Sequence, residues 1–295
     1  MKIDSAQLVT FEAVVAEGSF DAAARRLHVT PSAVSQRIKG LEQQLGQVLV
    51  RRARPVRPTE AGQALVRLAG QVALLESEAL AELRGGSVRP QLRMPIAVNA
   101  DSLASWFLPA LAALDVEQQV LFDVHQEDEE YSAALLRDGS VMAAVTADPM
   151  PVQGCAAQRL GSLRYLAMAA PAYVERWFPD GPTPDALAQA PVVVFNRKDA
   201  LQHQLLRRLT RRKLSPPAHY IPSSTAHADG VRLGLGWGMV PEQDARPDSD
   251  AGRLVDIAPG KHLDVALYWQ HWKLDSPVLR ILTETVRAAA AASLR

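Results

Sequence analysis

The sequence has a single cysteine and no long apolar segment, and both absences restrict what the protein can be. Cys155 is the one cysteine among 295 residues, so no internal disulfide, dithiol redox motif or cysteine zinc site can form. No apolar run approaches about 18 residues, which predicts no membrane span. The N-terminal residues interrupt their apolar positions with Asp4, Gln7, Glu12 and Glu17, so they contain no signal-peptide core. We therefore expect a cytoplasmic protein without membrane contact.

The motifs of common enzyme classes are also missing. The sequence contains no glycine-rich phosphate loop, no His-x-x-x-His pair and no Gly-x-Ser-x-Gly elbow, and its seven histidines do not cluster. The glycine-rich stretch at 234–238 lies between an expected helix and an expected strand. That is the wrong order for a dinucleotide loop, and it predicts a tight turn instead. The sequence thus favours neither an enzyme nor a bound metal or other cofactor.

Charge is balanced overall but unevenly distributed. The chain has 32 basic and 32 acidic residues, yet residues 20–58 contain eight basic residues and only two acidic ones. A compact basic patch on a neutral protein is typical of nucleic-acid binding, because Lys and Arg at phosphates release counterions. A merely solvated basic face is the alternative for such a run.

The same segment has the pattern of a helix-turn-helix. Residues 4–18 predict a helix that ends at a glycine, and residues 21–27 predict a short helix rich in alanine. Thr30 can cap the next helix, which continues to about residue 45. Residues 47–57 then predict a short arginine-rich hairpin, which suits a wing along a DNA backbone. This N-terminal domain is expected to span residues 1–58.

Small polar and basic side chains occupy the outer face of the helix that follows Thr30. If that helix enters a major groove, glutamine can pair with adenine and arginine with guanine, whereas arginines of the wing would contact phosphates. A solvent-exposed face with no partner is the alternative for any one residue. The predicted DNA-binding residues are Thr30, Pro31, Ser32, Ser35, Gln36, Arg37, Lys39, Arg51, Arg52, Arg54 and Arg57.

A long helix follows the predicted wing, and residues 59–90 are expected to form this helix and a hinge. The hinge would contain the Gly-Gly-Ser stretch at 85–87. Because an apolar seam on a single helix needs a partner, we expect a second copy of the chain to cover it. The residues of the seam, which recur every three or four positions, are Leu65, Leu68, Val72, Leu75 and Ala79.

The remaining residues, 91–295, alternate strand and helix patterns, which predicts an α/β domain with largely parallel sheets. We expect strands at 92–98, 119–126, 141–147, 163–169, 191–195, 217–221, 237–240 and 263–269. We expect helices near 102–114, 130–137, 171–177, 199–211, 225–234 and 276–292. Extended stretches at 148–160 and 256–264 would carry the chain between two lobes, one of about residues 91–155 plus 265–295 and the other of about 156–264.

Ligands of open α/β sheets bind beyond the carboxyl ends of strands, so polar residues there are candidates for ligand binding. Asp101 and Ser102 open a helix after a strand, where a helix N-terminus and a hydroxyl could hold a carboxylate; a plain helix cap is the alternative. The acids that start at Glu127 could pair with a cation, although such runs are usually solvated. The candidates are Asn99, Asp101, Ser102, Glu127, Asp128, Asp148, Asn196, Ser224, Thr225 and Asp229.

The sequence resembles the LysR-type transcriptional regulators. Similarity to the winged helix-turn-helix of that family lies in residues 20–42, FDAAARRLHVTPSAVSQRIKGLE, and similarity to the start of its linker helix lies in RPTEAG at 57–62. Pro31 lies one residue earlier than the proline of many members. Residues 32–42 and 98–111 further resemble the branch of the family that responds to lysine and arginine and controls the export of basic amino acids.

The resemblance implies a fold and a mode of action. The fold would join an N-terminal winged helix-turn-helix of the all-α type, a long linker helix, and a two-lobed α/β domain like that of periplasmic binding proteins. The partners would be double-stranded DNA with an interrupted inverted repeat, an effector such as lysine or arginine, further copies of the chain in a dimer or tetramer, and RNA polymerase. A regulator with a different effector is the main alternative. A solute-binding protein would explain only residues 91–295, and an enzyme lacks a motif.

Overall fold

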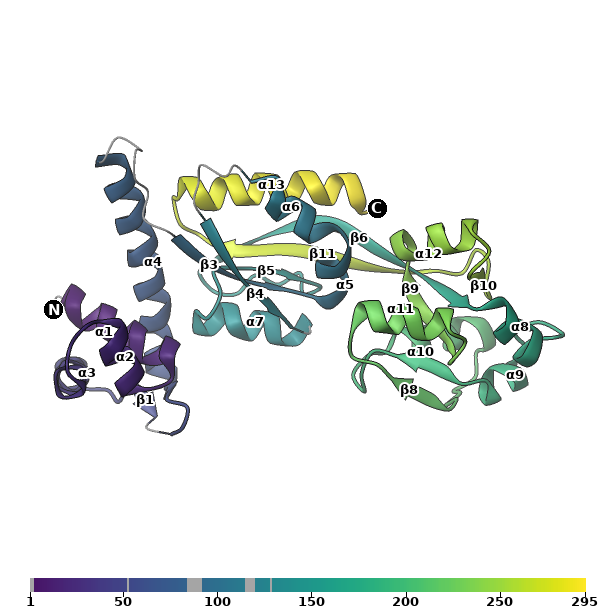
Figure 1. The fold of residues 1–295 in the computed structure, drawn as a ribbon, viewed down its shortest axis with the longest axis horizontal. Helices are drawn as coiled ribbons and strands as arrows, with labels where there is room; N and C mark the ends of the chain where they lie inside the picture. The colour runs from purple at the N-terminus through teal and green to yellow at the C-terminus, as the bar shows by residue number, and fades with distance from the viewer. Residues whose placement is uncertain (1–2, 52, 84–91, 115–119, 128) are drawn as a thin grey trace.

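A small helical domain, one long helix and a two-lobed α/β domain follow one another along the chain (Figure 1). The computed structural model describes residues 3–51, 53–83, 92–114, 120–127 and 129–295. The predicted hinge, the predicted phosphate contact Arg52 and the predicted ligand residue Asp128 lie outside these ranges. Figure 1 shows the long helix α4 at one end of the α/β domain, with the helical domain beside its first turns.

Helices and a short hairpin form the N-terminal domain. They are α1 (Ser5–Glu17), α2 (Phe20–Arg26), α3 (Pro31–Leu45), β1 (Val50–Arg51) and β2 (Arg57–Pro58). Asp4, Ser19 and Thr30 each accept a hydrogen bond from a backbone N–H of the helix that follows, so these caps define the helix starts. Phe11 and Ile38 are fully buried between the helices. The predicted winged helix-turn-helix is confirmed.

The hairpin is held against the turn between α1 and α2. The backbone N–H of Val56 donates to the carbonyl oxygen of Gly18 at 2.8 Å. Gly18 has a φ of 60°, and a Cβ there would lie 2.9 Å from the Cβ of Pro55. A side chain at this position would strain the backbone and collide with the hairpin, so the glycine fixes where the hairpin docks.

The long helix α4 (Glu60–Leu83) begins at a hydroxyl cap. Thr59 accepts a hydrogen bond from the backbone N–H of Gly62 at 3.1 Å and donates one to the carbonyl oxygen of Val48 at 2.7 Å. The cap therefore joins the start of α4 to the segment before the hairpin. Neither α4 nor any other helix of the described residues is long and apolar enough to cross a membrane.

Different faces of α4 have different neighbours. Leu65 packs in the core of the N-terminal domain, and Leu74 packs in the core of the α/β domain. Leu68 and Leu75 are 37% and 41% exposed in the single chain. Of the predicted seam, Leu65 therefore faces a core of its own chain, whereas Leu68 and Leu75 leave an apolar face open.

Polar contacts also attach α4 to the α/β domain. Arg67 donates to the carbonyl oxygen of Gln153 at 3.1 Å. Glu78 accepts hydrogen bonds from the Ser276 hydroxyl at 2.6 Å and from the Val278 backbone N–H at 3.2 Å. These contacts lie three turns apart on α4, so a displacement of this part of the α/β domain would displace the helix with it.

A single sheet continues through both lobes of the α/β domain. Its described strands are β3 (Leu92–Val98), β4 (Val120–Gln126), β5 (Ala143–Thr146), β6 (Cys155–Ala169), β7 (Val192–Val194), β8 (Ala218–Tyr220), β9 (Trp237–Pro241), β10 (Val255–Asp256) and β11 (Leu263–Trp272). Their order is β4-β3-β5-β11-β6-β9-β7-β8, with β10 beside β6. The pairs β3–β4, β3–β5, β7–β8 and β7–β9 are parallel, as predicted, whereas β6 and β11 run antiparallel to their neighbours.

The strands β6 and β11 connect the two lobes. All of β11 pairs with β6, from Leu263 opposite Tyr165 to Trp272 opposite Cys155, and Figure 1 shows the two strands passing from one lobe to the other. The sequence predicts an extended crossover at 148–160 and a separate strand at 163–169, whereas in the structure one strand, β6, begins at Cys155 and itself makes the crossing. The first residues of β6 are small or polar and carry little β propensity, so the pairing with β11 decides their conformation.

Helices cover the sheet on both faces; Figure 1 shows α13 and α6 on one side of the first lobe and α7 on the other. The helices are α5 (Ala100–Ser102), the π-helical turn η1 (Leu103–Phe107), α6 (Leu108–Ala112), α7 (Glu129–Asp138), α8 (Pro171–Trp177), α9 (Pro184–Gln189), α10 (Leu201–Thr210), α11 (Ser224–Arg232), α12 (Glu242–Asp250) and α13 (Pro277–Ser293). The sequence predicts all of these regions except α9 and α12. The α12 segment is strongly polar and contains Pro247, so its pattern does not indicate a helix.

Candidate functional site

Helix α3 presents a polar face to solvent. Val34 and Ile38 are buried on its inner side. Because these residues fix the orientation of the helix, the side chains between them point outward, as a helix that enters a major groove requires. The predicted DNA-binding residues on this outer face are Thr30, Pro31, Ser32, Gln36 and Lys39, which are exposed, and Ser35, which is half-buried.

Arg37 lies differently from the other residues predicted to read bases. Its guanidinium donates to the Thr10 hydroxyl at 3.2 Å. Thr10 is fully buried in α1 and donates in turn to the carbonyl oxygen of Ala6 at 2.6 Å. As the structure places it, the half-buried Arg37 joins α1 to α3 rather than lying on the exposed face.

Acidic residues of α1 neutralise part of the basic patch. Arg26 donates to both carboxylate oxygens of Glu12, at 3.0 Å in the shortest case, and lies 3.8 Å from Glu17. Both acids precede residue 20, so the charge count over residues 20–58 overstates the basic charge available to a polyanion. A charge count over one segment does not include ion pairs with acidic residues of another helix, as here with α1.

The wing exposes the arginines that the structure describes in it. Arg51 and Arg57 lie opposite each other on β1 and β2, and Arg54 lies in the connecting turn. Like charges opposite each other on paired strands are unfavourable unless an anion is close. The arrangement therefore suits contact with DNA phosphates, which sets affinity without reading sequence.

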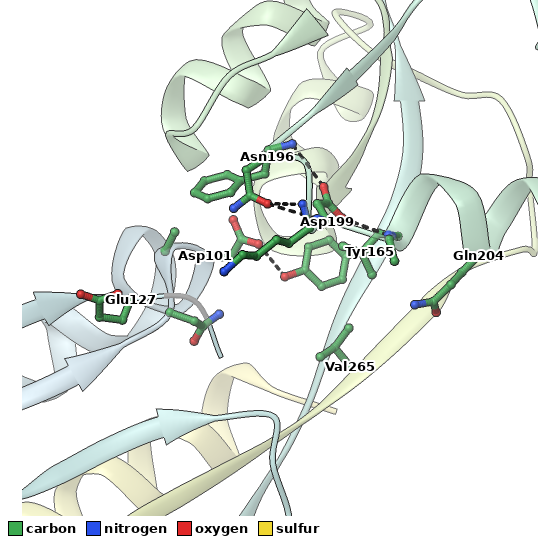
Figure 2. Close-up of a pocket in the computed structure, with 13 residues that line it drawn as sticks. Asp101, Glu127, Tyr165, Asn196, Asp199, Gln204 and Val265 are labelled. Carbon is green, nitrogen blue, oxygen red and sulfur yellow. Dashed lines mark hydrogen bonds between the residues drawn. The ribbon is translucent and has the colours of Figure 1, made fainter. Parts of the chain in front are cut away.

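A cavity of about 340 Å³ lies between the two lobes of the α/β domain (Figure 2). The first lobe contributes the carboxyl ends of β3 and β4, and the second contributes the loop after β7 and the start of α10. The crossing strands β6 and β11 complete the wall. The lining residues are Asn99, Ala100, Asp101, Glu127, Tyr165, Phe195, Asn196, Lys198, Asp199, Ala200, Leu201, Gln204 and Val265.

Two polar side chains, one directly after β3 and one in α5, are buried without a partner among the described residues. Asn99 is 8% exposed, occupies the cap position before α5 without making a side-chain cap, and leaves its Oδ1 unpaired. The Ser102 hydroxyl is fully buried and also unpaired. A buried acceptor without a donor is costly, so Asn99, which lines the cavity, is suited to accept a hydrogen bond from a ligand.

Asp101 is bound on both carboxylate oxygens. Its Oδ2 accepts a hydrogen bond from the Tyr165 hydroxyl at 2.5 Å, drawn in Figure 2, and its Oδ1 accepts one from the Ser224 hydroxyl at 2.5 Å. The interpretation of Asp101 as a plain helix cap is therefore incorrect, because its side chain contacts β6 and α11 instead of its own helix.

Other ionisable groups surround Asp101. Burial lowers the pKa of His227, although the negative charge of Asp101 partly opposes this, and the ring Nε2 lies 3.2 Å from the carbonyl oxygen of Val193. Burial raises the pKa of Asp244, and the nearby Asp101 raises it further. This region therefore favours a neutral imidazole and disfavours a second negative charge.

Glu127 offers an open carboxylate to the cavity. Its side chain makes no hydrogen bond or ion pair with any residue that the structure describes. Asp199 also lines the cavity, but its oxygens accept the backbone N–H groups of Phe195 at 3.2 Å and Leu201 at 2.9 Å, and it thereby shapes its own loop. Figure 2 shows Asp101 close to Asn196 and Asp199, with Glu127 farther away at the edge of the cavity. Glu127 is the acid best placed to receive a ligand cation.

The structure brings part of the predicted ligand set together. Asn99, Asp101, Glu127 and Asn196 line the cavity, Ser102 lies buried behind it, and Ser224 reaches Asp101. The other described candidates are outside the lining. Asp148 closes a turn by accepting from the backbone N–H of Met150 at 2.9 Å, Asp229 pairs with Arg232 at 2.6 Å, and Thr225 is exposed.

Several lining residues are not among the sequence candidates. Lys198 and Asp199 lie two and three residues after Asn196, so the strand-end rule that selects Asn196 could have included them. Tyr165 and Val265 lie inside the crossing strands, where no sequence signal marks a cavity wall. In the described part of the chain, no three histidine, cysteine or acidic side chains come together as metal ligands.

Two family models match this chain, and together they span most of it. Residues 5–63 match the bacterial regulatory helix-turn-helix protein, lysR family, and residues 85–291 match the LysR substrate binding domain. The first match contains α1 to the start of α4, and the second contains the cavity.

Proteins similar to this chain over nearly its whole length are named as the transcriptional regulators LysG and ArgP. The transcriptional regulator LysG of Mycobacterium bovis is 52% identical over 100% of this chain and 96% of its own length. The crystal structure of ArgP from Mycobacterium tuberculosis has a TM-score of 0.91 at 51% identity and covers 100% of this chain and 99% of its own. Full-length LysG from Corynebacterium glutamicum, solved with bound effector Arg, has a TM-score of 0.82 at 37% identity and covers 99% of both chains.

Proposed function

Because the chain belongs to the LysR family of bacterial transcriptional regulators, we propose that it senses a free basic amino acid and controls genes for amino-acid export or metabolism. Lysine and arginine are the proposed effectors. Curated relatives from Corynebacterium are named lysine export transcriptional regulatory proteins, which supports this assignment. In this proposal the protein acts in the cytoplasm on double-stranded DNA.

DNA binding is proposed to use α3 and the wing of two chains. Ser32, Ser35 and Gln36 would meet base edges, and the arginines of the wing would meet phosphates of an interrupted inverted repeat. A dimer would form through α4, with tetramers and contact with RNA polymerase as further partners. The corresponding division of the chain is 1–58 for DNA binding, 59–90 for the linker, and 91–295 for the effector domain, with lobes of about 91–155 plus 265–295 and 156–264.

The observation that carries the effector proposal is the open carboxylate of Glu127 beside the unpaired, buried Oδ1 of Asn99. Both groups accept hydrogen bonds, and a lysine ammonium or arginine guanidinium supplies only donors. An ion pair in a cavity that is partly shielded from solvent is stronger than one in bulk water. Lys198, on the loop after β7, brings a positive charge to the same cavity and is suited to the carboxylate of the amino acid.

Calorimetric titration of the full chain with lysine, arginine, glutamate and leucine tests this proposal. We expect lysine or arginine to bind, and Glu127→Gln to weaken that binding by about 10-fold or more, since a charge-assisted hydrogen bond contributes about 1.5–3 kcal/mol. Asp148→Asn is the matched control, because Asp148 is an exposed acid outside the cavity. A preference for glutamate or leucine, or equal binding by Glu127→Gln, would contradict the proposal.

A further inference from the structure

Asp101 connects three parts of the α/β domain that are far apart in sequence. Asp101 belongs to α5 in the first lobe, Ser224 begins α11 in the second lobe, and Tyr165 belongs to the crossing strand β6. Both hydroxyls donate to the same carboxylate, each at 2.5 Å. The Ser224 contact therefore passes directly from one lobe to the other beside the cavity.

We propose that Asp101 is a positioning residue that fastens the two lobes together, and that it is not the counter-charge of the effector. The inference rests on the proposed function only in taking this cavity as the effector site. Glu127 then supplies the negative charge that pairs with the cationic side chain of the effector. Asp101 instead determines how far the lobes are closed around the effector.

The geometry of the hydrogen bonds carries this assignment. A hydrogen bond from a hydroxyl to a carboxylate is among the stronger ones in proteins, because the acceptor is charged. A ligand cation at Asp101 would have to compete with both hydroxyls. Burial raises the pKa of Asp244, and burial lowers the pKa of His227, so neither neighbour supplies a positive charge to the Asp101 carboxylate. The hydroxyls of Tyr165 and Ser224 both contribute to stabilising its negative charge.

The lobes are joined a second time at a different place. Arg295 donates to both carboxylate oxygens of Glu242, at 2.7 and 3.0 Å, and the side-chain amide of Gln243 donates to the carbonyl oxygen of Ser293. These contacts link α12 of the second lobe to the end of α13, which Figure 1 shows side by side. With the lobes already tied there, loss of the Ser224 contact is expected to loosen the cavity side without separating the lobes.

A double-mutant cycle tests whether Asp101 and Ser224 act through each other. Lysine and arginine are titrated calorimetrically into the full chain and its Ser224→Ala, Asp101→Asn and doubly substituted forms. We expect each single substitution to raise Kd several-fold and the double substitution to raise it no further than Asp101→Asn alone, because both remove the same link. Ser224→Ala combined with Glu127→Gln is the additive control. Fully additive effects of Ser224→Ala and Asp101→Asn would overturn the proposal.

Hydrogen exchange of the effector-free protein provides a test that does not depend on ligand. Ser224→Ala should speed amide exchange in residues 99–107 of the opposite lobe, while Thr225→Ala, an exposed neighbour on the same helix, should leave it unchanged. Unchanged exchange in Ser224→Ala would overturn the fastening role. If the unsubstituted protein binds no basic amino acid, the effector assignment fails, and this exchange measurement still decides the role of Asp101.

Discussion

Trp272, the last residue of β11, packs against Gly70 of α4 so closely that a Cβ at position 70 would lie 2.8 Å from Cη2 of the indole. The other end of β11 reaches the cavity, where Val265 forms part of the wall. One strand therefore extends from the cavity to the helix that leads to the DNA-binding domain. This gives a continuous physical connection by which different degrees of lobe closure can place α4 differently.

Replacement of Gly70 by alanine should lower the free energy of unfolding. In most helix interiors this change stabilises by about 1 kcal/mol, but here the new methyl group meets the buried indole ring, and overpacking costs about 1–3 kcal/mol. Thermal or urea unfolding measures the effect. Trp272→Phe in the same chain should relieve part of it, whereas Gly40→Ala in α3, which meets only the end of the Gln7 side chain, should not destabilise. A higher melting temperature for Gly70→Ala would contradict the contact.

Replacement of Leu68 and Leu75 by aspartate should produce monomers. Both side chains lie on the open face of α4, and a charge buried there in a dimer would cost about 2 kcal/mol or more at each position. Light scattering measures the mass of the double variant in solution. Its affinity for operator DNA should fall together with the loss of the dimer. Leu233→Asp, at a site that is 80% exposed in the second lobe, is the control. An unchanged mass for the double variant would place the subunit contact elsewhere.

Substitutions on α3 and on the wing should change DNA binding in different ways. Gln36→Ala should alter base preference and leave the salt dependence nearly unchanged, because the side chain would meet a base edge. Arg54→Gln should weaken binding to all sequences and reduce the slope of log K against log salt by about 1. Fluorescence anisotropy with an operator selected from random duplexes measures both. If Arg54→Gln instead altered base preference and Gln36→Ala reduced the salt dependence, the wing rather than α3 would read the sequence.

Stability should fall as the pH is lowered from neutral. Burial lowers the pKa of His227 from 6.5, so between the folded and unfolded values the unfolded state binds more protons, and the free energy of unfolding decreases as pH falls below about 6.5. His271 acts in the same direction. Urea unfolding at several pH values should show a flatter profile for His227→Gln and an unchanged one for His219→Gln, whose side chain is exposed. Comparison with His227→Gln also separates this effect from Asp244, whose raised pKa acts in the opposite sense.

Local signals made the N-terminal domain predictable. Thr30 and Pro31 begin α3 and Gly46 ends it, so the helix bounds follow from capping chemistry alone. The strand at 92–98 was likewise predicted to the residue. Where distant pairing decides the structure, as in the first residues of β6, local patterns fail. Local patterns likewise do not predict the position of the Arg37 side chain, because its hydrogen-bond partner Thr10 lies on another helix.

The candidate site was predictable to the extent that it follows strand ends. Asn99, Glu127 and Asn196 each follow or end a strand and do line the cavity. The role of Asp101 could not be predicted, because the two hydroxyls that bind it come from β6 and α11. Residues in the middle of a strand, such as Tyr165, reach a cavity only when the strand crosses between lobes, and the sequence does not show that crossing.

The pairing of β11 with β5 also determines the order in which the protein can be completed during synthesis. Residues 143–146 have left the ribosome long before residues 268–271, which pair with them, and the second lobe lies entirely between these two segments. The first lobe must therefore wait with one edge of β5 unpaired while the second lobe is made. An unpaired edge strand can recruit other chains, so premature termination within the second lobe should yield a product that aggregates, even though its DNA-binding domain is already whole.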